Sequence, residues 1–175
     1  KETPAVRPVS DAVFEATLAE IGSPQVRAIL RLMRLTGARP GEVCIMRTGD
    51  IDRTASPWEY RPQTHKTAHR GHERVVYIGP RAQAVLADWL RADPEAFLFQ
   101  PREAAAAVRE ATKVAGRSDA DRARTARNNR AADARKRGGK AQNRRLPGER
   151  YTPGRLGHAV GRACKRAEIE HWHPH

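Results

Sequence analysis

Residues 35–43, Leu-Thr-Gly-Ala-Arg-Pro-Gly-Glu-Val, place an arginine between two segments of helical character. The first segment ends at Gly37 and the second begins at Pro40, so Arg39 lies in the short connection between them. An arginine held there can make bidentate hydrogen bonds to a phosphate, supported by the free amides of a helix N-terminus. The alternative is a surface arginine beside a helix cap. Taken alone, so short a pattern favours that second interpretation.

Other residue types with chemical potential give weaker signals. The histidines gather in two short segments, His65, His69 and His72 in one and His171, His173 and His175 in the other. Imidazoles can bind zinc, copper or nickel, but no cysteine or carboxylate partners stand at the usual ligand spacing, and we predict no metal site. Cys44 and Cys164 lie within apolar helical patterns and are expected to be small core residues. The sequence holds no Gly-Lys-Ser phosphate loop, which argues against nucleotide hydrolysis.

The arginine segment resembles the first arginine box of the tyrosine recombinases, the phage-integrase family. That box has the pattern Thr-Gly-x-Arg-x-x-Glu, and it is complete here in Thr36, Gly37, Arg39 and Glu42. In the family a three-stranded sheet follows, and a loop between its strands carries a lysine. Lys66 lies in such a loop between two expected strands.

The later landmarks of that family also occur here in the same order. A Leu-Phe segment appears as Leu98-Phe99, a helix follows from Thr152, and Pro174-His175 resembles the start of the His-x-x-Arg box. The resemblance therefore covers nearly all of the chain except about residues 101–150.

In this family a tyrosine attacks a DNA phosphodiester, giving a 3′-phosphotyrosyl link that the 5′-hydroxyl of a partner strand later reverses. The resemblance implies that Arg39 is one of two arginines that clamp the scissile phosphate, where negative charge builds up in the transition state. It implies that Lys66 protonates the leaving 5′-oxygen and that His175 assists the phosphate and the nucleophile. Glu42 is expected to orient the arginine helix. No cofactor is implied, because the protein–DNA ester stores the bond energy.

The sequence departs from the family pattern at its end. The family's second arginine and its nucleophilic tyrosine have no counterpart, since Tyr60, Tyr77 and Tyr151 all precede the histidine box. We therefore expect a fragment of a longer protein that cannot cleave DNA by itself, whereas the full-length protein could. In that longer protein, Arg39→Ala should abolish strand cleavage and leave much of the DNA affinity.

Hydrophobic spacing and capping residues predict the elements that must position these side chains. Helices are expected from Ser10 or Asp11 to Gly22, from Ser23 to Gly37, from Pro40 through Met46, from Pro80 to before Asp93, and from Thr152 through Ala167. Strands are expected at 58–61 and 73–78. The resulting fold class is α+β, mostly helical with a small antiparallel sheet. The resemblance specifies it as a DNA breaking-rejoining, integrase-like catalytic domain with three strands.

The positive charge of the chain is concentrated in one segment. Residues 101–150 carry a net charge of +9, whereas 1–100 and 151–175 carry +2 each. The segment has no bulky apolar residue between Val114 and Leu146, so it is a solvated helix or disordered. Either it contacts a nucleic-acid backbone or it is a solvated insertion, and we favour contact. The cations expected to bind are Arg117, Arg122, Arg124, Arg127, Arg130, Arg135, Lys136, Arg137, Lys140, Arg144 and Arg145.

The chain as a whole has 175 residues and a net charge of +13, which points to a polyanion partner. It lacks a long apolar run and a signal peptide, and we expect a cytoplasmic protein with no membrane partner. We divide it into the first part of a catalytic domain (1–100), a basic insertion (101–150) and a helix leading into the truncated histidine box (151–175). The expected partner is double-stranded DNA, with the full-length protein assembling as a tetramer on it.

A second hypothesis is a non-catalytic, basic nucleic-acid-binding module. It predicts that Arg39, Lys66 and His175 lie apart, and that binding is lost mainly by neutralising residues 117–145. The first hypothesis predicts that those three residues converge on a basic concave surface.

Overall fold

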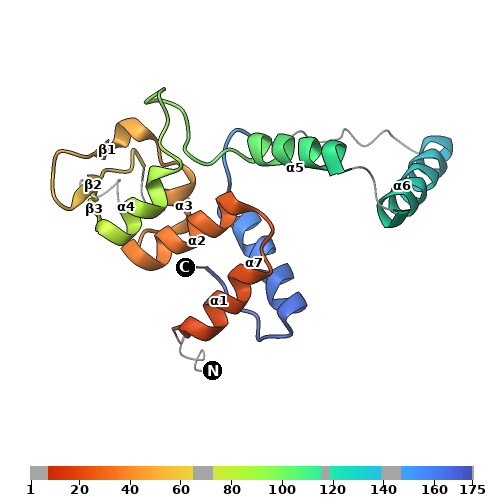
Figure 1. Cartoon of the computed structure of the whole chain (residues 1–175), viewed down its shortest axis with the longest axis horizontal. Coiled ribbons are helices and arrows are strands. Elements are labelled where there is room, and N and C mark those ends of the chain that lie inside the picture. The colour runs from red at the N-terminus through yellow and green to blue at the C-terminus, as the bar shows by residue number, and fades with distance from the viewer. Residues whose placement is uncertain (1–7, 65–72, 116–118, 139–146, 175) are drawn as a thin grey trace. The chain divides into compact units, whose positions relative to one another are not determined.

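The computed structural model describes residues 8–64, 73–115, 119–138 and 147–174, and within the helices the side chains at 112–115, 119–122, 131 and 134–138 are not described. The chain divides into two compact units, residues 1–100 with 149–175, and residues 101–148. The helices of the first unit are α1 (Asp11–Ala19), α2 (Pro24–Thr36), α3 (Pro40–Cys44), α4 (Pro80–Ala87) and α7 (Pro153–Ala167), with a 3₁₀ turn at Thr48–Asp50. Its strands are β1 (Ile51–Asp52), β2 (Trp58–Tyr60) and β3 (Val76–Ile78) (Figure 1).

The helix α2 is the centre of this unit, because it packs against α3, α4 and β3. The Ser23 hydroxyl accepts a hydrogen bond from the Val26 amide at 3.4 Å, and Pro24 occupies the first turn, where a missing N–H costs nothing. The predicted apolar stripe is confirmed, since Val26, Ile29, Leu30 and Met33 are all buried. Gly37 ends the helix in the left-handed conformation (φ 66°), and its amide donates to the Met33 carbonyl at 2.9 Å.

Replacing Gly37 by alanine should destabilise the protein, because a Cβ at a left-handed position meets backbone strain even where space is open. We expect a loss of about 1 kcal/mol in the free energy of unfolding, measured by urea denaturation. Gly22 is a matched control, because neither it nor Gly37 has a heavy atom within 4 Å of an added Cβ and its φ is not positive. Equal effects of Gly37→Ala and Gly22→Ala would contradict the assigned cap.

The sheet that the structure describes is antiparallel, in the order β1-β2-β3. Ile51 pairs with Tyr60 and Tyr60 with Val76, and all three side chains are buried. On the opposite face Glu59 pairs with Tyr77, which is 60% exposed. This period-two burial places one face of the sheet on the core. The predicted class, mostly helical with a small three-stranded antiparallel sheet, is confirmed.

Several expected elements were too long. The first helix ends at Ala19 rather than near Gly22, and the first expected strand ends at Tyr60 rather than at 61. The helix from Pro40 ends at Cys44 rather than Met46, because the Met46 carbonyl accepts from the Leu98 amide at 2.9 Å and the chain turns away to make that contact. The helix from Pro80 ends at Ala87, and the Arg91 amide instead donates to the Thr48 hydroxyl at 2.9 Å. The last strand begins at Val76 rather than at 73. For the two helices, a long-range contact takes over a backbone group that continuation would need.

The helix α7 closes the core of the first unit by packing on α1 and α3. The Thr152 hydroxyl caps it by accepting from the Arg155 amide at 3.4 Å, and Pro153 occupies the first turn, as the sequence predicts. Its buried residues are Leu156, Val160, Ala163 and Cys164. After α7 the chain stays attached to this core through Trp172, whose indole N–H donates to the Thr17 hydroxyl at 3.0 Å.

The second unit consists of α5 (Pro101–Ala115) and α6 (Asp119–Gly138). The composition of this segment left two alternatives, a solvated helix or disorder. Its described residues are helical. The last residue of α6 is Gly138, a residue type that disfavours continuation of a helix. Among the described residues, no helix combines the length and apolar character needed to cross a membrane.

Candidate functional site

Arg39 is positioned by the end of one helix and the start of the next. The Thr36 hydroxyl donates to the Leu32 carbonyl at 2.6 Å and accepts from the Ala38 amide at 3.2 Å, which fixes the turn after α2. Ala38 is buried, whereas the Arg39 side chain is 46% exposed. The turn thus anchors the backbone on the core and directs a cation toward solvent.

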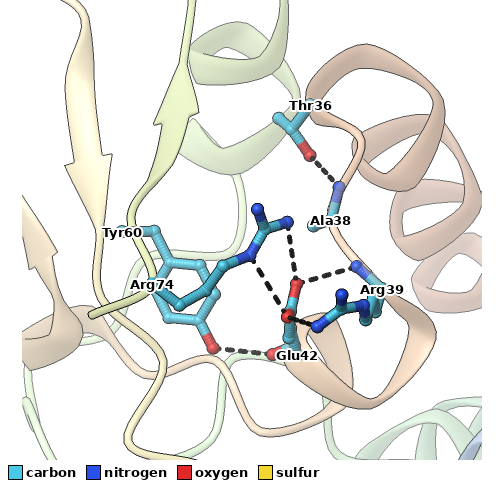
Figure 2. Close-up of polar contacts among 6 residues, drawn as sticks. All are labelled: Thr36, Ala38, Arg39, Glu42, Tyr60 and Arg74. Carbon is cyan, nitrogen blue, oxygen red and sulfur yellow. Dashed lines mark hydrogen bonds and ion pairs between the residues drawn. The ribbon is translucent and has the colours of Figure 1, made fainter. Parts of the chain in front are cut away.

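Glu42 lies directly under this arginine and is only 3% exposed. Its Oε2 accepts from the Arg39 backbone amide at 2.9 Å, and its Oε1 accepts from Arg39 Nη1 at 3.4 Å. From the other side Arg74 donates through Nε to Oε1 at 3.3 Å and through Nη2 to Oε2 at 3.4 Å (Figure 2). A buried carboxylate needs such partners, because an unpaired charge in the interior is very costly. Glu42 therefore orients the arginine helix, as expected from the sequence.

Tyr60 connects the sheet to the same helix. Its ring is fully buried, and its hydroxyl donates to the Glu42 backbone carbonyl at 2.7 Å. Burial, followed by the negative charges of Asp50 and Glu42, raises the pKa of Tyr60. The phenol consequently stays protonated and acts as a hydrogen-bond donor across the physiological pH range.

A pocket of about 440 Å³ opens beside Arg39. The start of α7 forms its far wall, with Tyr151 and Thr152, and Arg150 adds a second guanidinium to the lining. Cys44 also borders it. Burial raises the pKa of the Cys44 thiol to about 12, against a smaller opposing effect of Arg150. The Cys44 thiol therefore stays protonated and does not act as a nucleophile. The guanidinium groups of Arg39 and Arg150 give the pocket the capacity to bind an anion.

The structure places part of the predicted site. Arg39 lies at the pocket, whereas Lys66 and His175 are outside the described residues, so convergence of the three stays a prediction. On α6 the side chains of Arg124, Arg127 and Arg130 are exposed. Arg122, Arg135, Lys136 and Arg137 lie on α6 with side chains that are not described, and Arg117, Lys140, Arg144 and Arg145 lie outside the described residues.

The histidines give no metal site in the described part of the chain. The rings of His171 and His173 meet edge to face with centroids 4.4 Å apart, but no cluster of three or more histidine, cysteine or acidic side chains could hold an ion there. His65, His69 and His72 lie outside the described residues.

Sequence reasoning missed Arg74 and Arg150. A signal for Arg74 existed in the expected strand 73–78, because residues at a spacing of two share a face. Arg74 is two residues before Val76 and four before Ile78, both of which are buried. An arginine on the same face of a strand as two core residues indicates a buried acidic partner. No comparable pattern marked Arg150.

The fold and the site together define a class: a mostly helical domain with a small antiparallel sheet, which presents an arginine from a helix junction braced by a buried carboxylate. No family model and no curated protein matches the chain. Among solved structures it resembles XerA recombinase, with a TM-score of 0.50 and 15% sequence identity. The match covers 97% of this chain and 47% of that one, so the chain spans about half the length of XerA recombinase. At this identity the likeness shows a recombinase-like fold.

Proposed function

We propose that the chain is a DNA-binding part of a site-specific tyrosine recombinase, in which Arg39 binds the phosphate at which strands are cut and rejoined. The observation that carries the proposal is the half-exposed Arg39, braced by buried Glu42 at the edge of a pocket, in a recombinase-like fold. A guanidinium placed in advance suits phosphoryl transfer, because charge on the non-bridging oxygens increases in the transition state. The same proposal gives roles to two further residues. Lys66 acts as the general acid that protonates the leaving oxygen, and His175 assists at the phosphate.

Two of the three tyrosines support a binding role for the 175 residues themselves. Tyr60 and Tyr151 are buried, and burial raises the pKa of both phenols, which disfavours the phenolate a nucleophile needs. Strand cleavage through a 3′-phosphotyrosyl link, and assembly as a tetramer on double-stranded DNA, are proposed for the whole protein.

Arg39→Gln tests the proposal in this chain. The substitution keeps the backbone amide that Glu42 accepts from and removes one cation, so the fold should persist while one phosphate contact is lost. We expect about five-fold weaker binding to a fluorescent DNA duplex and a salt slope shallower by about 0.9, measured by anisotropy at several salt concentrations.

Arg31→Gln provides the matched control for Arg39→Gln. Arg31 is an exposed arginine on α2 whose ion pair with Glu15 is long, at 3.9 Å, and its loss removes the same charge from the same unit. If Arg39→Gln binds DNA with the affinity and slope of Arg31→Gln, the proposed phosphate contact is wrong.

The second candidate function, a non-catalytic nucleic-acid-binding module, is favoured by one observation on α6. Arg124, Arg127 and Arg130 recur at every third residue and are exposed. This spacing spreads them over an arc of about 120° on the helix, so they can contact one phosphate backbone together. Such contacts would give affinity without sequence choice.

A further inference from the structure

Arg74 approaches Glu42 as a fork, through Nε and Nη2, and is 32% exposed. Arg39 reaches the same carboxylate through its backbone amide and through Nη1 of its guanidinium. Figure 2 shows the two guanidinium groups entering from opposite sides, one from the turn before α3 and one from the segment that leads into β3.

The hydrogen-bond capacity of Glu42 is filled by these contacts. A carboxylate offers about four lone-pair positions, and here each oxygen accepts one bond from Arg39 and one from Arg74. The contacts from Arg74 involve two of its guanidinium N–H groups, whereas Arg39 contributes one. A guanidinium carries five N–H donors, so most of those on Arg39 point elsewhere.

The charges of Glu42, Arg39 and Arg74 agree with this distribution of hydrogen bonds, in which Arg74 is the more committed partner of Glu42. One buried carboxylate lies between two cations, so the group of three carries a net positive charge. Were Arg74 absent, the buried charge of Glu42 would draw on the Arg39 guanidinium for compensation. The half-exposed position of Arg39 would then give way to a closer ion pair, and its donors would turn from solvent to Glu42.

We propose that Arg74 is a positioning residue that neutralises Glu42 and thereby leaves Arg39 available for phosphate. This inference rests on the proposed function of Arg39. It assigns to Arg74 an effect on DNA binding that is exerted through Glu42, without a contact between Arg74 and DNA.

A reversal experiment with Glu42→Gln tests this role in the 175-residue chain, with the same fluorescent duplex. Arg74→Gln alone should weaken binding about five-fold, because Arg39 is drawn onto the uncompensated carboxylate. The double variant Glu42→Gln with Arg74→Gln should bind within two-fold of the wild type, because the charge that captured Arg39 is gone and the two amides can hydrogen-bond each other. Arg61→Gln is the control, since Arg61 pairs with Glu59 and Glu73 at the same sheet without touching Glu42.

Each outcome decides the matter. If the double variant binds as weakly as Arg74→Gln, Arg74 contacts DNA itself and the proposal is overturned. Wild-type binding by folded Arg74→Gln overturns it as well. If circular dichroism shows that Arg74→Gln does not fold, Arg74→Lys replaces it, because lysine keeps the charge beside Glu42. This variant should bind within two-fold of the wild type. Five-fold weaker binding by folded Arg74→Lys contradicts charge compensation. Failure of the proposed function is seen separately, as an absence of effect in Arg39→Gln.

Discussion

Replacing Glu42 by alanine is expected to lower the free energy of unfolding by about 3 kcal/mol, a large fraction of the stability of a small domain. The substitution leaves the Arg39 amide and two guanidinium groups without the acceptor they share, and it opens space beneath α3. The measurement is urea denaturation followed by circular dichroism. We place the value at the lower end of the range for broken buried pairs, because both arginines are partly exposed and water can reach them.

Glu95→Ala is the matched control for Glu42→Ala. Glu95 pairs with Arg47 at 2.7 Å, a shorter contact than either arginine makes to Glu42 by side chain, yet the Glu95 side chain is 74% exposed. An exposed pair contributes little, and we expect a loss of less than about 1 kcal/mol. Similar losses in the two variants would show that burial of Glu42 does not govern the energetics of the site.

Neutralising three arginines of α6 is expected to have the largest effect on DNA affinity. With Arg124, Arg127 and Arg130 changed to glutamine, the slope of log affinity against log salt should fall by about 2.7, and binding at low salt should weaken by about a hundred-fold. Binding isotherms for a duplex of arbitrary sequence, measured at salt concentrations from low to physiological, give both the affinity and its salt slope. Arginine and glutamine both favour helix, so α6 itself should persist.

The control for this variant removes the same charge elsewhere. Arg31, Arg53 and Arg81 are exposed arginines of the first unit that lie outside the Arg39 pocket. If changing these three weakens binding as much as changing the α6 arginines, net charge alone drives association and α6 has no special role. If the α6 variant loses nearly all binding while Arg39→Gln has no effect, the non-catalytic module is the better description.

The sequence predicted well those features that depend on neighbouring residues. The start of α2 at Ser23-Pro24 and its end at Gly37 follow from side-chain capping and from the freedom of glycine at positive φ, and both are local effects. The cap of α7 at Thr152-Pro153 is local in the same way. The position of Arg39 between two helices followed from these signals.

The partners of that arginine could not be predicted in the same manner. Arg74 and Glu42 are 32 residues apart, and Tyr60 and Glu42 are 18 apart. Their contacts depend on how the sheet packs against α3, which tertiary structure decides and capping residues do not. The early end of α3 has the same origin, because the Met46 carbonyl pairs with Leu98. The two-residue strand β1 is too short for a recognisable alternation of apolar and polar residues.

The division of the first unit into two stretches of sequence has a consequence for chain entropy. Thr17 on α1 and Cys164 on α7 are in contact across 147 residues, and residues 101–148 make up about a third of that loop. The entropy of closing a loop grows only with the logarithm of its length, so carrying this segment costs about 0.3 kcal/mol. The segment can therefore lengthen or shorten at little cost while α1 and α7 remain packed. The length of residues 101–148 is thus largely independent of the packing that positions the arginine site.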